Sequence, residues 1–335
     1  MIDAFQHIGI GVTDIERSMD FYGRILGFRI KLNDHEEPFE QMVSIIGSLC
    51  RMRVIMAANI RGGAAVELVQ HTDSTPIPMP ADARWGDIGY LAAGLKAFRL
   101  EDVVHRASTL GLEFVTPVAS AESPEGVWRW AYLKDPDGLL LEALETPDLR
   151  AKGGAPRLGG FTHAVIGVSD MERSIAFYRD VIGFDGVVFD TSETPEGMEA
   201  ATGGAACRTV TLKRTMKPAS AFPLDGGMVR LVQLADGGGK PLYEGRRWGD
   251  VGIMEMAMDV RDVVGTYRNA VELGASEFCG PTLMDMGMGS VGSFAYVKDP
   301  DGNIVELVET RKLGYLPPSV VSPLLKGLLA VTSRR

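Results

Sequence analysis

Apolar and polar residues follow two periods along the chain, and the two periods succeed each other in a fixed order. Residues 7–12 alternate in the manner of a half-buried strand. In residues 15–26 the apolar side chains fall on one helical face, which predicts a helix ended by Gly27. Thr13 stands three residues before Glu16, a spacing that predicts a capping box at the helix start. The first block therefore reads as a strand followed by a helix.

The whole series of signals occurs twice. A strand–helix block, an RWGD block and a late hairpin block appear in the same order in both halves, and the offset between copies drifts only from 156 to 164 residues. Loop insertions produce such a drift, so the chain is an internal duplication. The paired blocks are residues 5–28 with 161–184, 84–89 with 247–252, and 128–145 with 292–309.

Further strands and helices complete two strand–helix–strands units in each half. Residues 64–70 and 227–233 predict strands, while residues 99–110 and 262–273 predict helices. The late hairpins turn at D-P-D-G, whose Pro and Gly favour the required backbone angles. We therefore predict four units, arranged as an N-terminal domain (1–148), a linker (149–160), a C-terminal domain (161–312) and a tail (313–335).

Composition narrows the class of protein. Hydrophobic residues make up 45% and charged residues 23% of the chain, which is typical of a globular protein. The net charge of −10 argues against nucleic-acid binding. Three scattered cysteines indicate neither a disulfide framework nor a zinc–thiolate site. No signal peptide or membrane span is evident, so we expect a cytoplasmic protein that acts on a small molecule, as a monomer or homo-oligomer.

The repeated pattern resembles the vicinal oxygen chelate superfamily, which includes glyoxalase I, bleomycin-resistance proteins and type I extradiol dioxygenases. A strand-borne His before a D-x-E-R-S-x-x-F-Y helix, and a D-P-D-G-x-x-x-E-L close, carry the resemblance over about residues 5–310. It implies an α+β fold of four βαβββ modules that form two glyoxalase-like curved-sheet cups in tandem. The reaction stays open, because the superfamily hosts several chemistries on this scaffold.

The resemblance also implies four metal-ligand positions in each cup. The positions that match in the first half hold His7, Glu67, Ala92 and Glu142, and those in the second half hold His163, Arg230, Glu255 and Glu306. We expect one divalent ion (Zn, Mn, Co, Ni or Fe(II)). The preferred ligand set is His163, Glu255 and Glu306, and the second possible set is His7, Glu67 and Glu142.

Two residues near these positions are candidates for substrate binding. Tyr90 lies two residues before Ala92, which would place both on one strand face and let Tyr90 substitute for the missing ligand. Arg230 has three interpretations. It binds an anionic substrate group, it pairs with Glu255 or Glu306 and displaces the metal, or it points outward after a register shift.

Three functions follow from the resemblance. The first is proton-transfer chemistry of an isomerase, epimerase or lyase, through a metal-bound enediolate, with Glu67, Glu255 or Glu306 as the base. The second is Fe(II) ring cleavage by an extradiol-type dioxygenase, which a second-sphere His would assist; His163 is the only His of the second half. The third is non-catalytic binding of a small molecule by a resistance-type protein.

Overall fold

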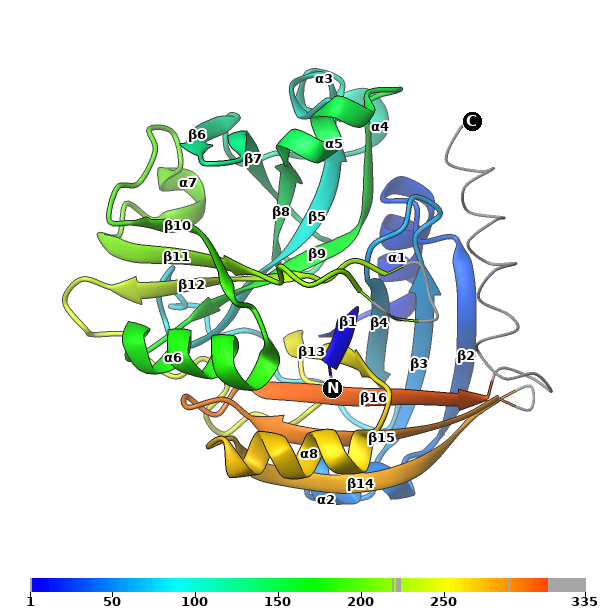
Figure 1. Cartoon of the computed structure of the whole chain (residues 1–335). Coiled ribbons are helices and arrows are strands. Elements are labelled where there is room, and N and C mark those ends of the chain that lie inside the picture. The colour runs from blue at the N-terminus through cyan, green and yellow to red at the C-terminus, as the bar shows by residue number, and fades with distance from the viewer. Residues whose placement is uncertain (1, 219, 221–223, 288–289, 313–335) are drawn as a thin grey trace.

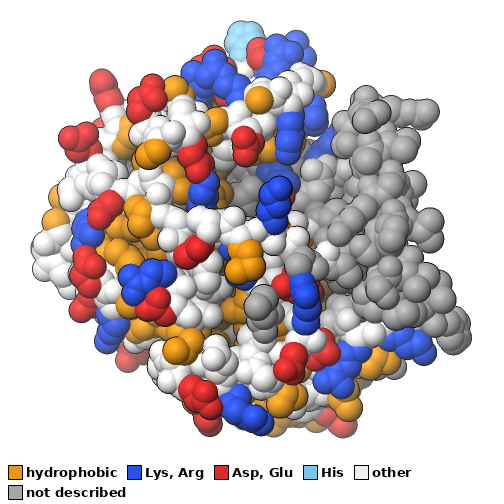
Figure 2. All heavy atoms as spheres, viewed as in Figure 1, with side chains coloured by type: hydrophobic (Ala, Val, Ile, Leu, Met, Phe, Trp, Pro, Cys, Tyr) orange, Lys and Arg blue, Asp and Glu red, His pale blue; other side chains and the backbone are white. Residues whose placement is uncertain are grey.

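The computed structural model describes residues 2–218, 220, 224–287 and 290–312, and it contains four βαβββ modules. The expected tail, 313–335, lies outside the described residues. No helix of the described residues is long and apolar enough to cross a membrane. On the face in Figure 2, acidic and basic side chains are interspersed.

The first two modules occupy residues 2–152. Module 1 comprises β1 (Ile2–Gly11), α1 (Ile15–Met19), the π turn η1 (Asp20–Ile25), β2 (Ile30–Pro38), the 3-10 turn η2 (Glu40–Met42), α2 (Val43–Ile46), β3 (Arg51–Ala58) and β4 (Ala65–His71). Module 2 comprises β5 (Gly89–Phe98), α3 (Leu100–His105), α4 (Ala107–Leu110), β6 (Ala119–Ser123), β7 (Gly126–Lys134) and β8 (Leu140–Glu145), followed by α5 (Pro147–Lys152). The predicted strands and helices of this half are confirmed, while α5 makes the start of the expected linker helical.

The second half repeats the plan. Module 3 comprises β9 (Arg157–Gly167), α6 (Met171–Phe177), the π turn η3 (Tyr178–Ile182), β10 (Gly186–Thr191), α7 (Glu199–Thr202), β11 (Cys207–Lys213) and β12 (Met228–Leu234). Module 4 comprises β13 (Gly252–Val260), α8 (Val263–Glu272), β14 (Ser276–Gly287), β15 (Ser290–Lys298) and β16 (Ile304–Lys312).

Modules from different halves share each sheet. Sheet A has the order β14-β15-β16-β13-β1-β4-β3-β2, so it joins modules 1 and 4, and sheet B has the order β10-β11-β12-β9-β5-β8-β7-β6, so it joins modules 2 and 3. Figure 1 shows the two curved sheets, with the blue strands of the N-terminus and the orange strands of the C-terminus in the same one. We call the concave sides the sheet A cup and the sheet B cup.

The predicted pairing of modules is therefore wrong. We expected each half, 1–148 and 161–312, to close its own cup, but β1 pairs antiparallel with β13, and β5 pairs antiparallel with β9. The two modules of one half instead meet where a helical turn of one module contacts a hairpin turn of the other. The domain boundaries at 148 and 161 stay a prediction.

Contacts between a helix and a hairpin turn hold the two modules of each half together. The Tyr22 hydroxyl donates to Asp135 (3.0 Å), and the Tyr178 hydroxyl donates to Asp299 (2.9 Å). The F-Y and D-P-D-G motifs of the sequence are thus contact partners. Thr13 bonds Asp137 through its backbone N–H and its hydroxyl.

These turn contacts explain why the predicted capping boxes are absent. The helix caps are Asp14 and Asp170, one residue later than predicted, and each side chain accepts a backbone N–H at 3.0 Å. Thr13 is bonded to the Asp137 turn and Glu16 pairs with Arg53, so neither is available for a capping box. The predicted helix end at Gly27 is confirmed to within one residue, because Leu26 is the cap and Gly27 follows with a φ of 91°, and in the second copy Gly183 is itself the cap with a φ of 89°.

Asp135 gives one testable property of this arrangement. Burial raises the pKa of Asp135 to about 6, despite hydrogen bonds from Leu139, Tyr22 and Asp137 to its carboxylate. A raised folded-state pKa contributes stability that is present below the ordinary value of 3.8 and is lost as pH rises to about 6. Asp135→Asn keeps an oxygen for the backbone donors and carries no charge.

We therefore expect Asp135→Asn to gain stability relative to the parent as pH rises from 4 to 6. About two pKa units correspond to a relative gain of up to about 3 kcal/mol in the free energy of unfolding. Urea unfolding of both proteins at several pH values measures it. Parallel stability curves across this pH range would show that Asp135 does not titrate as described.

Candidate functional site

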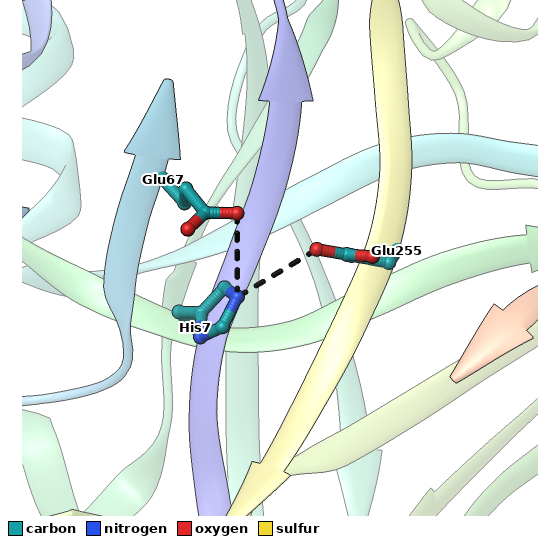
Figure 3. A group of neighbouring side chains, drawn as sticks. All are labelled: His7, Glu67 and Glu255. Atoms are coloured by element: carbon teal, nitrogen blue, oxygen red, sulfur yellow. Dashed lines mark ion pairs between the residues drawn. The ribbon is translucent and has the colours of Figure 1, made fainter. Parts of the chain in front are cut away.

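Four side chains with metal-ligand chemistry converge in the sheet A cup. His7 (β1), Glu67 (β4), Glu255 (β13) and Glu306 (β16) come from the four central strands of the sheet. The Nε2 atom of His7 lies 3.2 Å from Glu306 Oε2 and 3.8 Å from a carboxylate oxygen of both Glu67 and Glu255. Figure 3 shows Glu67 and Glu255 pointing at His7 from the strands on either side.

Neighbouring side chains fix the orientation of two members of this group. The Gln6 amide oxygen lies 2.5 Å from His7 Nδ1, and because that oxygen only accepts, Nδ1 carries the proton. In the neutral imidazole, Nε2 then presents its lone pair to the carboxylates. The Trp248 indole N–H donates to Glu255 Oε2 (2.8 Å), which leaves Oε1 facing His7.

Glycine provides the space for one of these side chains. Gly9 pairs with Glu255 across the two central strands, and a Cβ atom at this position would lie 2.9 Å from the Glu255 Cγ. A larger residue would therefore push Glu255 out of its place. The second sheet repeats the feature, because a Cβ atom at Gly94 would lie 1.8 Å from the His163 ring.

Negative charge accumulates in this buried group, and a bound cation would compensate it. Burial and the neighbouring carboxylates raise the pKa of Glu67 to about 8 against the opposing effect of His7, and burial, with the repulsion of Glu306, also raises the pKa of Glu255. Burial alone would lower the pKa of His7, but Glu255, Glu306 and Glu67 raise it well above its ordinary value. Protonated His7 supplies one positive charge against three carboxylates.

The residues present fit a divalent metal ion. His7 Nε2 and Glu255 Oε1 are buried and have no hydrogen-bond partner in the described part of the chain. Ligand atoms of His7, Glu67 and Glu255 lie within 4.8 Å of one another. One imidazole and three carboxylates form a hard, anionic donor set that suits Mn²⁺, Zn²⁺, Co²⁺ or Fe²⁺. His7, Glu255 and Glu306 would hold the ion, and Glu67 would lie beside it.

A cavity of about 480 Å³ lies beside this group. Its described lining contains no Lys or Arg, and it combines His7, Glu67 and Glu306 with apolar side chains such as Phe39, Met42 and Phe294. Four polar side chains of β2, Asn33, Asp34, His35 and Glu37, also line it. The cavity can therefore accept a small molecule next to the carboxylates.

The sheet B cup holds a different group at the matching positions. Glu142 accepts from Arg230 Nη1 (2.5 Å) and from the Tyr132 hydroxyl (2.7 Å), and its second oxygen lies 3.4 Å from His163 Nε2. Burial alone would raise the pKa of Glu142, but the charges of Arg230 and His163 lower it to about 2. Ala92 at the fourth position offers no ligand atom. Arg230 supplies the positive charge here, so this group does not fit a metal ion.

The structure regroups the predicted ligand sets. Glu255 and Glu306 lie with His7 rather than His163, and Glu142 lies with His163 rather than His7. Both expected sets are therefore wrong in composition, because each sheet takes one module from each half. Arg230 points inward and pairs with a glutamate, but the partner is Glu142.

Tyr90 lies in neither cup. Its hydroxyl donates to the Ile304 carbonyl (2.6 Å) and accepts from the Met256 N–H (3.1 Å), between the two sheets. The register of β5 shifts between Tyr90 and Ala92. Such a bulge breaks the alternation of side chains, so the expectation that both share a face is wrong.

Several residues of the site carry no prediction from the sequence. Trp248 belongs to the repeated RWGD block, and Tyr296, which lies opposite Glu306 on the neighbouring strand, belongs to the repeated hairpin block. Their repetition in both halves was the available signal. His35 and Gln6 occur in one half only, and nothing in the sequence distinguishes them from surface residues.

Comparison with known protein families gives a match to both halves of the chain. The family model described as Glyoxalase/Bleomycin resistance protein/Dioxygenase superfamily matches residues 4–143 and 160–307. No curated protein sequence matches the chain significantly.

Solved structures with the same fold span nearly the whole chain. A glyoxalase I variant from Zea mays has a TM-score of 0.61 at 16% identity, covering 91% of this chain and 93% of its own. A candidate dioxygenase from Bacillus subtilis has a TM-score of 0.57 at 14% identity, covering 98% and 95%. At such identities the likeness shows the fold alone. The family match over both halves shows that the chain belongs to the glyoxalase/bleomycin resistance protein/dioxygenase superfamily.

Proposed function

We propose that the chain is a divalent-metal-dependent enzyme that transfers a proton on a small substrate with vicinal oxygens, as an isomerase, epimerase or lyase does. The observation that carries the proposal is the group of three buried or nearly buried carboxylates around His7 Nε2. A divalent ion held there would polarise a substrate oxygen and stabilise negative charge that develops on it.

Glu67 is the residue best placed to move the proton. Its side chain is 15% exposed, against 7% for Glu306 and 0% for Glu255, and it lines the cavity. Its carboxylate accepts no hydrogen bond from the described residues, whereas Glu255 accepts one from the Trp248 indole. We assign Glu67 as the base that removes a proton alpha to a carbonyl.

Glu67→Gln is therefore expected to lower turnover by at least about 100-fold while His7, Glu255 and Glu306 keep the metal in place. Steady-state kinetics with metal analysis of the same sample measures both. Glu37→Gln, at an exposed position that also lines the cavity, is the matched control and should retain activity. Unchanged turnover in Glu67→Gln would assign the proton transfer to another residue.

A dioxygenase is the second candidate, and one observation favours it. His35 lines the same cavity as His7, so a second histidine is available as an acid or base near the substrate. The group around His7 Nε2 contains one histidine and three carboxylates, and this composition counts against a dioxygenase. The anionic substrate suggested by Arg230 loses its support, because Arg230 lies in the other cup.

Metal analysis and an exchange assay together test these proposals. The chain is purified without oxygen or chelators, its metals are quantified, and α-hydroxy ketones and 2-oxo aldehydes are incubated with it in D₂O. Bound Zn, Mn, Co or Ni with deuterium entering alpha to the carbonyl supports proton transfer. Bound iron, together with oxygen consumption on catechols and no deuterium exchange, would favour the dioxygenase over the proton-transfer enzyme. A chain that binds no metal under any condition would leave a non-catalytic binding protein.

A further inference from the structure

A second cavity of about 560 Å³ opens in the sheet B cup. Aromatic side chains line it, among them Trp85 of the segment before β5, Trp130 and Tyr132 of β7, and Phe189 of β10. The Trp85 and Tyr132 rings pack edge to face with centroids 5.5 Å apart. These walls are flat, rigid surfaces of the kind that aromatic ligands stack on.

Arg230 is the one cationic side chain in the described lining of this cavity. Its Nη1 donates to Glu142 and its Nε donates to Thr211 (3.2 Å), while its guanidinium lies 5.3 Å from the Trp130 ring centroid. The remaining nitrogen, Nη2, has no hydrogen-bond partner among the described residues. Arg230, which lines the cavity, therefore keeps the N–H groups of Nη2 for a further partner.

The charges around the cavity disfavour an anion. Glu142 already compensates the charge of Arg230, and three further carboxylates, of Glu122, Asp190 and Glu193, line the cavity. Arg208 compensates the charge of Asp190, and the carboxylates of Glu122 and Glu193 leave an excess of negative charge around the cavity. A ligand that carries a carboxylate would meet these groups, whereas an uncharged molecule would not.

We propose that the sheet B cup is a metal-independent binding site for a neutral, planar aromatic molecule that accepts a hydrogen bond from Arg230. The aromatic walls supply the stacking surface, Arg230 Nη2 supplies the donor, and the compensated charges select against anions. Because no metal takes part, the site is independent of the function proposed for the sheet A cup.

Two naphthalene probes of nearly equal shape test the proposal. The first, 2-acetylnaphthalene, is neutral and carries a carbonyl acceptor, while 2-naphthoate carries a charge in the same place. Ligand-observed NMR of the full chain in excess EDTA measures both affinities. We expect the ketone to bind with a dissociation constant on the order of 1 mM or lower, as ligand efficiency gives for a molecule of this size, and the naphthoate to bind more weakly.

Paired variants locate the site. Phe189→Ala removes a half-buried wall of the sheet B cavity and is expected to weaken the ketone about tenfold. Phe39→Ala removes the half-buried counterpart in the sheet A cavity. It is the matched control and should leave the affinity for the ketone unchanged. The charge-balanced double variant Arg230→Met/Glu142→Gln removes the donor without stranding a buried charge, and it is expected to weaken the ketone about tenfold.

Four results would overturn the proposal. They are tighter binding of the naphthoate than of the ketone, no binding of either probe, binding only after a divalent metal is added, and loss of affinity in Phe39→Ala instead of Phe189→Ala. The far-ultraviolet circular dichroism of each variant verifies that it is folded before binding is compared.

Discussion

His7→Ala and Glu306→Ala are expected to leave the chain without bound metal, whereas His163→Ala keeps it. His7 Nε2 is the atom on which the three carboxylates of the sheet A cup converge, so its loss removes the common ligand. Substitution of residues that only support metal ligands weakens binding by about 10–100-fold, and loss of a ligand should exceed that. Metal analysis of the purified variants, after dialysis against buffer without metal, measures the effect.

His163→Ala is an informative control because both histidines occupy the same place in the repeat. His7 is 2% and His163 is 1% exposed, so the two substitutions cost similar packing. Metal that is lost in His163→Ala and retained in His7→Ala would move the site to the sheet B cup, and it would contradict the assignment of Arg230 as the cation there.

Arg230→Met is expected to lower the free energy of unfolding by about 3–5 kcal/mol, because it strands the fully buried Glu142 carboxylate. Adding Glu142→Gln should recover most of the loss, since no buried charge is then unpaired. Urea unfolding of the single and double variants, at a pH well above the Glu142 pKa, measures both values.

The neighbouring strand offers a matched control for this prediction. Arg208, on β11, pairs with Asp190 and Glu172, but its side chain is 34% exposed. Exposed ion pairs are typically worth less than about 1 kcal/mol, so Arg208→Met should have a small effect. Equal losses in Arg208→Met and Arg230→Met would show that burial does not set the cost.

Local patterns predicted the modules because each depends on neighbours in the sequence. Alternation placed the strands, helical periodicity placed α1 and α8, and the D-P-D-G turns placed the hairpins. The superfamily and the four-module cup fold, expected from the repeat and the resemblance, are confirmed. Local patterns also brought the correct residue types to the inward strand positions, among them His7 and Glu67.

Pairing between modules could not be predicted in the same way. The edge of β1 has no local signal that selects β13 over β5 as its partner, because β5 and β13 are copies of the same repeated strand. The predicted ligand groups were wrong for this reason alone. The prediction for Tyr90 was wrong because β5 contains a bulge between Tyr90 and Ala92. A single extra residue in a strand leaves no recognisable pattern in the sequence.

The exchange of modules between the halves has a consequence for how the two cups could become different. If one half assembled as a symmetric pair of identical chains, both cups would contain the same residues, and any substitution would appear in both at once. Joining two copies in one chain removes that constraint. Arg230 and Ala92 could then enter one cup while their counterparts Glu67 and Glu255 persisted in the other. Covalent fusion thus separates the inheritance of two sites that symmetry would keep identical.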